Sequence, residues 1–404
     1  MNPLQTVNKD AIKHLSTYGL ALFFFLTPFE YPLADLMAVS PLRIVGLVAM
    51  ALAVLDIFKQ WILKIDYRFL SVALLLFYGL VSFIWALDRE RFSSYYSIYF
   101  NNALMFLLFS LVTFTKHETQ VLKKSMIFGV GALLLYMTFI PDAVIYSDYQ
   151  NRLTLNAGKD GMDQNYLAAL MLIAFGLVFY ALCNNKELKK SHKILSVVFC
   201  IAIVYYVFLT GSRSGLLAIL LISMLSINTS WKTRLYVGIP IALIITCIFP
   251  ILSWYIPEEL LQRFSLKAIT GQEAESETRL LIWSHTIQFM KDFKWIFGCG
   301  VGASQTVVGN LLGTGKDMAI HNHYLAMIVE FGLVGSLFIN IPIFKMDIRM
   351  WKQDKSLGIA FIGIMIMALF IDVITTKFFW EAMILLSVCS GVRAGNSLKG
   401  ENNL

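Results

Sequence analysis

Charged side chains are scarce in this sequence. Aspartate, glutamate, lysine and arginine make up 15% of its 404 residues, whereas a soluble globular protein carries about 25%. Hydrophobic residues reach 58%, and apolar runs of roughly 20 residues, the length that crosses a bilayer as a helix, recur along nearly the whole chain. The sequence therefore excludes an ordinary soluble protein. It predicts an all-α, polytopic membrane protein that forms a single domain over residues 1–404.

The sequence also has no dense basic patch. Its net charge of +7 is spread over short loops between apolar segments, as is typical of signals that orient membrane helices. This distribution argues against nucleic acid as a partner and indicates the lipid bilayer instead.

Metal-binding and nucleotide-binding motifs are missing as well. The five cysteines are scattered, odd in number and without CxxC spacing, so they indicate neither a disulfide framework nor a metal site. The sequence has no HExxH motif, no DxD pair and no P-loop. We therefore expect no metal and no cofactor.

Twelve membrane spans are predicted from the apolar runs. They cover residues 15–33, 42–58, 69–87, 98–115, 125–146, 164–183, 194–210, 214–228, 235–256, 320–344, 357–376 and 378–392. With the N-terminus inside, most of the 33 basic residues fall on inner loops and tails, so the positive-inside rule places both termini in the cytoplasm. Residues 257–319 then form a large outer loop between spans nine and ten. Its amphipathic stretch TRLLIWSHTIQFMKDFKWIF is suited to a helix at the membrane interface.

Polar residues at the outer ends of the spans need an explanation, because such groups are costly in or near a bilayer. Arg213 lies in TGSRSGLLA between two apolar segments, where its small neighbours Ser212 and Ser214 allow another group to approach. The alternative is an arginine that anchors a helix end at the interface. Arg279 opens the amphipathic stretch of the outer loop; taken alone, it would be a solvated surface charge.

Histidine and glutamate mark the tenth span, HNHYLAMIVEFGLVG. His321 and Asn322 stand at its outer start, although a histidine there is more often a hydrogen-bonded structural residue than a catalyst. Glu330 lies about 13–14 Å deeper if the helix is straight, at ~1.5 Å per residue, and on the opposite face. We therefore expect Glu330 to be a structural partner and not a reacting group.

Four more polar residues fall on the same outer face in this topology. Asp163 and Asn165 begin the sixth span in DQNYLAALM, where helix capping is the alternative interpretation. Arg152 lies just upstream, and Lys377 stands near the start of the last span. Because the topology rests on other charges, this gathering supports one site on the outer side.

Arginines and a histidine on one face fit a particular chemistry. Guanidinium groups offer rigid pairs of donors to phosphate oxygens, and a nearby histidine can take a proton from an attacking hydroxyl. This set suits the transfer of a group from a membrane-anchored diphosphate to an alcohol outside the cell, with arginines in place of a metal ion.

Four motifs in this order resemble the bacterial O-antigen polymerase and ligase family. They are DQNYLAALM, TGSRSGLLA, Arg279 ahead of Trp283 and GCGVG, and HNHYLAMIVEFGLVG, and the resemblance covers roughly residues 150–390. It implies a glycosyltransferase that takes a glycan from undecaprenyl diphosphate on the periplasmic face of the bacterial inner (plasma) membrane. Polymerases of the family pass the glycan to another lipid-linked repeat unit, and ligases pass it to the lipid A core.

The resemblance also implies residue roles. Arg213 and Arg279 match the diphosphate-binding arginines of the family, with Arg152 as a further donor-binding candidate, and His321 matches its general base. His323 has no counterpart that we can assign. The compact DQN and SRSG motifs favour a polymerase, and a ligase is the alternative.

Two other classes of protein compete with this interpretation. A twelve-helix transporter would usually show two related halves, but the halves of this sequence look unrelated and its longest loop lies outside. A membrane scaffold without chemistry would leave the outer arginines and histidine unexplained.

Overall fold

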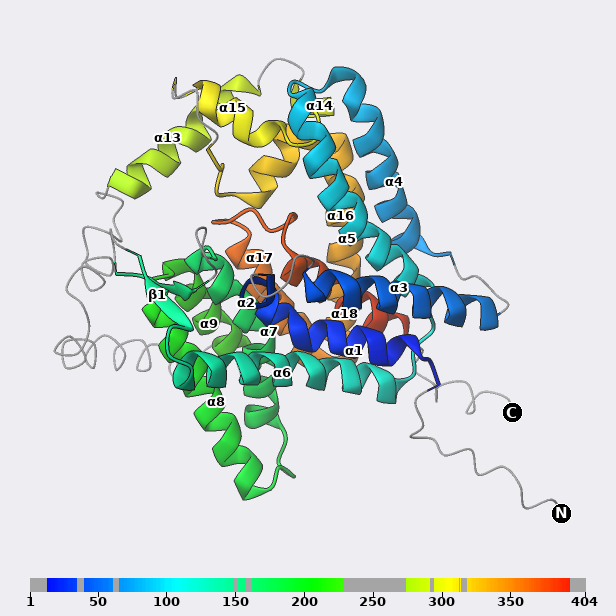
Figure 1. Ribbon diagram of the computed structural model, residues 1–404, viewed down its shortest axis with the longest axis vertical. Coiled ribbons are helices and arrows are strands. Elements are labelled where there is room, and N and C mark those ends of the chain that lie inside the picture. Colours follow the sequence, from blue (N-terminus) through cyan, green and yellow to red (C-terminus); the bar gives the residue numbers. More distant parts are fainter. Residues whose placement is uncertain are drawn as a thin grey trace, which may run out of the picture.

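A computed structural model describes residues 13–34, 40–60, 65–147, 151–156, 162–227, 274–290, 294–311, 313 and 318–392. Within these ranges the chain is a bundle of helices with one short two-stranded hairpin (Figure 1). The helices are α1 (Ser16–Leu26), η1 (Thr27–Phe29), α2 (Glu30–Ala34), α3 (Pro41–Lys59), α4 (Tyr67–Val81), η2 (Ser82–Trp85), α5 (Arg89–Leu111), α6 (Lys116–Phe139), α7 (Gln164–Asn184), α8 (Lys190–Leu209), α9 (Arg213–Ser226), α13 (Ala274–Phe289), α14 (Lys294–Phe297), α15 (Ala303–Leu311), α16 (His323–Gln353), α17 (Lys355–Met367) and α18 (Lys377–Gly391). Strands β1 (Val144–Tyr146) and β2 (Leu153–Leu155) pair antiparallel, with Val144 opposite Leu155.

Short polar side chains set the start of several helices. Each accepts a hydrogen bond from a backbone N–H of the first turn, which has no partner within the helix. These caps are Asp66, Asp88, Thr115, Asp163, Ser212 and Asn322. The apolar runs between them form the long helices.

Six described helices are long and apolar enough to cross a membrane. They are α3, α4 together with η2, α6, α7, α8 and α16, and α9 and α17 are shorter apolar helices. They confirm the prediction of an all-α membrane protein. Twelve as the number of spans stays a prediction, because the ninth predicted span, residues 235–256, lies outside the described residues.

Several predicted borders differ from the structure. The fourth and fifth spans were expected over residues 98–115 and 125–146, but α5 begins at Arg89, α6 runs from Lys116 to Phe139, and residues 144–146 form strand β1. The tenth span was expected over residues 320–344, but α16 begins at His323 and continues to Gln353. The eleventh was expected to reach residue 376, but α17 ends at Met367 and residues 368–376 are not helical. That segment therefore forms a loop in front of α18.

The bundle is built around α7, which packs against α6, α8, α9 and α17. Gly176 of α7 allows the close approach of α17, because a Cβ at this position would lie 2.6 Å from the Cβ of Ala360. Small residues of this kind govern helix packing in membranes, where burying apolar side chains against one another gains little over contact with lipid. Around this centre, α1 packs on α3 and α6, and α4 packs on α5 and α16.

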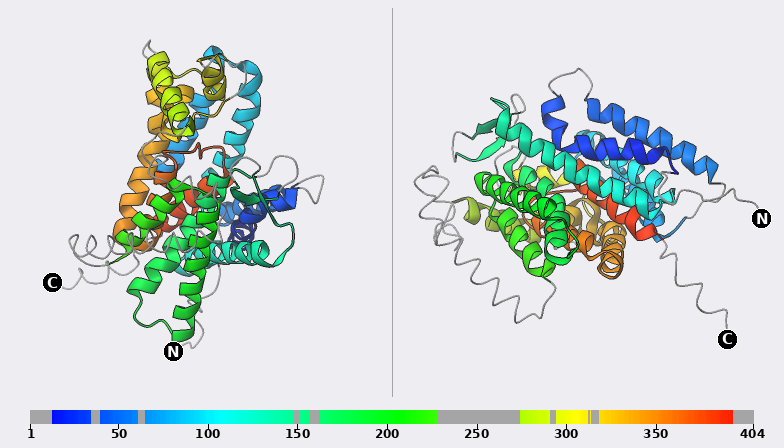
Figure 2. Two further views of the ribbon diagram at one scale, coloured as in Figure 1. Left: turned by 90° about the vertical axis from the view of Figure 1, so that its left-hand side faces the viewer. Right: turned by 90° about the horizontal axis from the view of Figure 1, so that it is seen from below.

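The segment between α9 and α16 contributes a second, smaller apolar cluster. Ile282 of α13, Val307 of α15 and Val329 of α16 are among its buried members. Figure 1 shows α13, α14 and α15 gathered at one end of the molecule, and the left view of Figure 2 agrees. These helices therefore cover the start of α16.

Candidate functional site

The start of α7 is built by Asp163. Its carboxylate accepts hydrogen bonds from the backbone N–H groups of Asn165 (2.8 Å) and Tyr166 (3.2 Å). Helix capping, which the sequence offered as the alternative to a binding role, is therefore the arrangement that the structure shows for Asp163.

Arg152 joins three elements in the interior. Its side chain is buried, with 6% of the residue exposed. The Nε–H donates to the carbonyl oxygen of Thr210 (2.8 Å), and the Nη2–H donates to the side-chain oxygen of Asn165 (3.1 Å). A buried charge needs such partners. Arg152 therefore holds the hairpin, the end of α8 and the start of α7 together, and these two donors are used within the protein.

The SRSG turn places Arg213 at the start of α9. The hydroxyl oxygen of Ser212 accepts a hydrogen bond from the N–H of Gly215 (3.2 Å) and lies 3.3 Å from the hydroxyl oxygen of Ser214. Gly215 packs on α7, where a Cβ would come 3.1 Å from that of Ala168. The two serines are buried, whereas Arg213 is partly exposed. The small residues thus fix the backbone against α7 and leave the guanidinium near the surface.

Helix α13 carries Arg279 to the segment that precedes α16. Arg279 and Trp283 are four residues apart and therefore share one face of α13. The indole N–H of Trp283 donates to the carbonyl oxygen of Ile320 (2.9 Å). Ile320 directly precedes His321, so this bond docks the helix of Arg279 beside His321.

His321 lies outside the helix, on a strained backbone. Its φ angle of 53° falls in the left-handed region, which a histidine adopts uncommonly. Asn322 then caps α16, because its side-chain oxygen accepts a hydrogen bond from the N–H of Leu325 (3.0 Å). The expectation that His321 opens a straight helix with Glu330 on the opposite face is therefore wrong, since α16 begins at His323.

His323 points into the protein. It is fully buried, and its backbone N–H donates to the carbonyl oxygen of Ala368 (2.8 Å). Its ring Nδ1 lies 3.4 Å from the carboxylate of Asp372, and its ring centroid lies 5.5 Å from that of Phe379. The hydroxyl of Tyr166 donates to the backbone carbonyl of Asp372 (3.0 Å). The loop that carries Asp372 therefore links the start of α16 to the start of α7.

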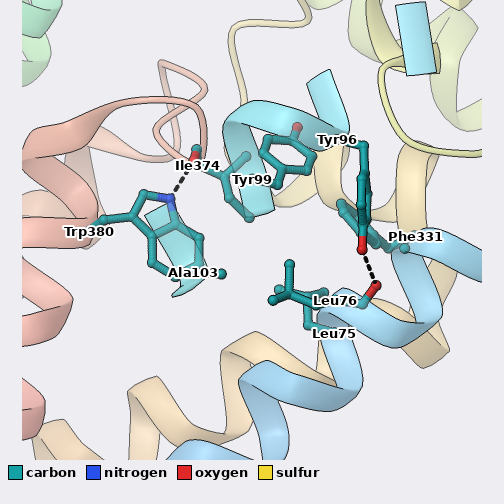
Figure 3. A pocket seen from close by; sticks show the side chains of 9 residues that line it. Leu75, Leu76, Tyr96, Tyr99, Ala103, Phe331, Ile374 and Trp380 are labelled. Atoms are coloured by element: carbon teal, nitrogen blue, oxygen red, sulfur yellow. Dashed lines mark hydrogen bonds between the residues drawn. The ribbon is translucent and has the colours of Figure 1, made fainter. Parts of the chain in front are cut away.

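Glu330 ties three elements together below the histidines. Its buried carboxylate accepts hydrogen bonds from the hydroxyl groups of Ser304 (2.6 Å) and Tyr99 (2.8 Å). Tyr99 and Phe331 also line a small apolar cavity, seen from close by in Figure 3. These contacts join α5, α15 and α16, so the glutamate has partners within the protein.

Helix α16 is broken just after Glu330. Gly332 has a φ angle of 63°, and the helical path changes there. The carbonyl oxygens of Val329 and Glu330 accept hydrogen bonds from the N–H groups of Cys299 (2.7 Å) and Gly300 (3.0 Å). These two hydrogen bonds fix the GCGVG segment against α16 beside the break. Gly298, Gly300 and Gly302 in this segment all have positive φ angles, which glycine adopts without steric cost.

Lys377 stands apart from the other site residues. It is the first residue of α18, and its ammonium group pairs with the carboxylate of Glu30 in α2. This ion pair joins α2 to α18, the last of the described helices.

The contacts divide the expected site residues into two groups. One surrounds Arg213, where the hairpin, α7 and α9 meet, and the other holds Arg279 and His321, where α13 reaches α16. The sequence analysis gave no role to Tyr166 or Trp283, whose side chains donate hydrogen bonds to the backbone of Asp372 and Ile320. Each lies on the same helix as an expected site residue, which is the only feature of the sequence that could have pointed to it. In the described ranges, no three histidine, cysteine, aspartate or glutamate side chains gather as a metal site would.

Part of the chain matches a known family. Residues 195–339 match the model of a family described as O-antigen ligase. The matched region contains the SRSG turn, Arg279, the GCGVG segment and the first half of α16. No curated protein matches the chain. The family match confirms the resemblance that the motifs indicated.

Proposed function

We propose that this chain is a membrane-embedded glycosyltransferase, on the premise that residues 195–339 match the model of a family described as O-antigen ligase. It takes a glycan from undecaprenyl diphosphate and passes it to an acceptor hydroxyl on the periplasmic face of the bacterial inner membrane. Both termini then lie in the cytoplasm. The observation that carries the proposal is the bond from Trp283 to Ile320, because it docks the helix of a phosphate-binding arginine beside a histidine that can act as a base.

Arg213 and Arg279 bind the diphosphate oxygens of the donor in this proposal. The bond between the anomeric carbon and the diphosphate oxygen breaks, and the diphosphate leaves with the electron pair. The guanidinium groups stabilise the negative charge that develops on the leaving oxygen. Ser212 and Ser214 hold the turn on which Arg213 stands, while Arg152 and Asn165 fix that turn against α7.

His321 removes the proton from the acceptor hydroxyl as its oxygen attacks the anomeric carbon. A positioned general base contributes about 10²–10⁴-fold in rate. Attack from the side opposite the leaving diphosphate inverts the anomeric centre, so an α-linked donor gives a β-linked product. Asn322 fixes the backbone next to His321 by capping α16.

Two acceptors are compatible with this chemistry. The compact DQN and SRSG motifs favour a second lipid-linked repeat unit, which makes the protein a polymerase. The description of the matched family favours the lipid A core, which makes it a ligase. Purified protein supplied with a lipid-linked donor and each acceptor in turn will separate them: longer lipid-linked chains identify a polymerase, and glycan on the lipid A core identifies a ligase.

The arginine roles can be tested by substitution. Arg213→Ala and Arg279→Ala should each lower glycan transfer by about 10²–10³-fold, the effect of removing one donor that stabilises developing charge. Lysine at either position should restore only part of the activity, because an ammonium group lacks the paired donors of a guanidinium. Arg89→Ala is the matched control, since Arg89 is exposed at the start of α5. Full activity in both alanine variants, at normal levels in the membrane, would refute diphosphate binding by these arginines.

The proposal also predicts transfer without a metal ion. Purified protein should keep its activity in excess EDTA, because arginines stabilise the leaving diphosphate. Loss of activity in EDTA that magnesium or manganese restores would contradict this prediction.

A further inference from the structure

A large cleft lies beside the site and is not explained by it. Its volume is about 500 Å³, and it is bordered by α1, η1, α2 and α3 on one side and by α5, α7 and the start of α18 on the other. None of the arginines or histidines of the proposed site lines it. A cleft of this size falls within the range of ligand sites, which are usually about 300–1,000 Å³.

The wall formed by α5 is unusually polar for a helix of a membrane bundle. Asn101 and Asn102 lie in the middle of this 23-residue helix and line the cleft together with Ser97. Ser94, Ser97 and Asn101 follow helical spacing and share one face. Among the described residues, neither asparagine side chain has a hydrogen-bond partner, and Asn101 is exposed. Both amides line the cleft, where their donors and acceptors are available to a polar group of a ligand.

The opposite wall adds a cation. Arg43 lies near the start of α3, lines the cleft and is exposed, and its guanidinium has no partner among the described residues. Lys377 also lines the cleft but pairs with Glu30. The charges of these three side chains sum to +1, which together with the amides favours an anionic group.

Much of the remaining lining is apolar, although the hydroxyl groups of Thr27, Thr375 and Thr376 also border the cleft. On α3, Leu47 and Met50 follow Arg43 along the same helix, and Phe23 of α1 and Met105 of α5 also line the cleft. Seven residues separate Arg43 from Met50, about 10 Å along the helix at ~1.5 Å per residue. A cationic and amide-rich part thus adjoins an apolar part, which fits a lipid with a phosphate head.

The position of the cleft relates it to the acceptor side of the site. Tyr166 of α7 lines the cleft, and its hydroxyl bonds the backbone of Asp372, whose carboxylate faces His323. His323 follows His321 by two residues. The cleft therefore meets the site at the start of α7, which the bond from Tyr166 to Asp372 ties to the loop next to the histidines.

We propose that this cleft binds the phosphate-bearing lipid anchor of the acceptor, with Arg43, Asn101 and Asn102 around the phosphate and the apolar wall along the lipid chain. The inference rests on the proposed function for the identity of its ligand. A lipid-linked repeat unit and a phosphorylated lipid A core share this chemistry, so the cleft serves either acceptor.

The test separates acceptor binding from donor binding. Asn101→Leu removes the amide and keeps a side chain of similar size. Leucine is a good helix former, so the protein should fold at least as well as the wild type. At saturating donor, Asn101→Leu and Arg43→Ala should raise the KM for acceptor about tenfold or more and change kcat little, as expected for the loss of a hydrogen bond to a charged group. The KM for donor should stay unchanged, and Arg89→Ala should change neither constant.

Lipid binding gives a readout that does not depend on transfer. Native mass spectrometry of the purified protein with undecaprenyl monophosphate, with diphosphorylated lipid A and with phosphatidylglycerol as separate probes should show a bound lipid that Asn101→Leu and Arg43→Ala lose and Arg213→Ala retains. Stronger retention of undecaprenyl monophosphate indicates a polymerase, and stronger retention of diphosphorylated lipid A indicates a ligase. Equal retention of phosphatidylglycerol, or binding and acceptor KM that survive both cleft substitutions, would overturn the inference. Absence of any transferase activity with this binding pattern intact would instead refute the proposed function and leave a phosphate-lipid site.

Discussion

At the residue scale, the backbone of His321 separates its role from that of His323. A histidine held at a φ of 53° needs its surroundings to keep it there, and such strain is often found at functional sites. We predict that His321→Asn lowers kcat by about 10²–10⁴-fold while donor binding persists. Asparagine tolerates the left-handed region, so this variant keeps the backbone and removes the base. The pH–rate profile checks it: wild-type activity should fall at acidic pH as an imidazole protonates, and this fall should vanish in the variant.

His323 supplies the comparison for that experiment. It is buried against Phe379 and Asp372, so His323→Ala should lower the thermal stability through lost packing more than it changes the acid limb of the pH profile. Near-normal turnover of His321→Asn together with a well-folded but inactive His323→Ala would show that the base has been assigned to the wrong histidine.

At the scale of the element, the break in α16 depends on two glycines that face each other. A Cβ on Gly332 would come 2.2 Å from the carbonyl oxygen of Ile296, and one on Gly298 would come 2.4 Å from that of Glu330. Both also have positive φ angles. We predict that Gly332→Ala and Gly298→Ala destabilise the protein by more than the ~1 kcal/mol of an unfavourable φ alone. Thermal unfolding in detergent measures the loss.

Gly313→Ala is the matched control for this prediction. Gly313 has a φ of 64°, but a Cβ there would meet nothing within 4 Å. Its substitution carries the conformational strain without the steric overlap, so its melting temperature should fall least of the three. Equal losses in all three variants would show that close packing against the GCGVG segment contributes nothing.

The elements also show what sequence reasoning could and could not predict. Long apolar runs predict α3, α6, α7 and α8 because a bilayer demands length and hydropathy in each helix separately. The start of α16 was predicted too early, at residue 320. The apolar pattern does not show that Asn322 caps the helix, so that the helix begins only at His323. The ties made by Arg152 could not be predicted, because they depend on a hairpin that brings distant segments together.

At the scale of the whole molecule, the orientation in the membrane can be measured. In a variant without native cysteines, a single cysteine at Tyr146 in the hairpin or at Asn310 in α15 should react with a membrane-impermeant maleimide added outside. A cysteine at Lys189, just before α8, or at Lys352, in the last turn of α16, should react only after the membrane is permeabilised. The positive-inside rule assigns both positions to the cytoplasm. All four positions are exposed in the structure. Labelling at Lys189 from outside would invert the orientation and place the arginines on the cytoplasmic side.

The ion pair between Glu30 and Lys377 has a consequence for how the protein is made. The ribosome delivers the helix of Glu30 early and that of Lys377 late, so most of the period of synthesis separates the two partners. Until α18 has inserted, the cleft lacks one of its borders and Glu30 lacks its cation. A chain released early would therefore carry an unpaired carboxylate and an open flank in the bilayer, which are features that membrane quality-control proteases can distinguish from the finished protein.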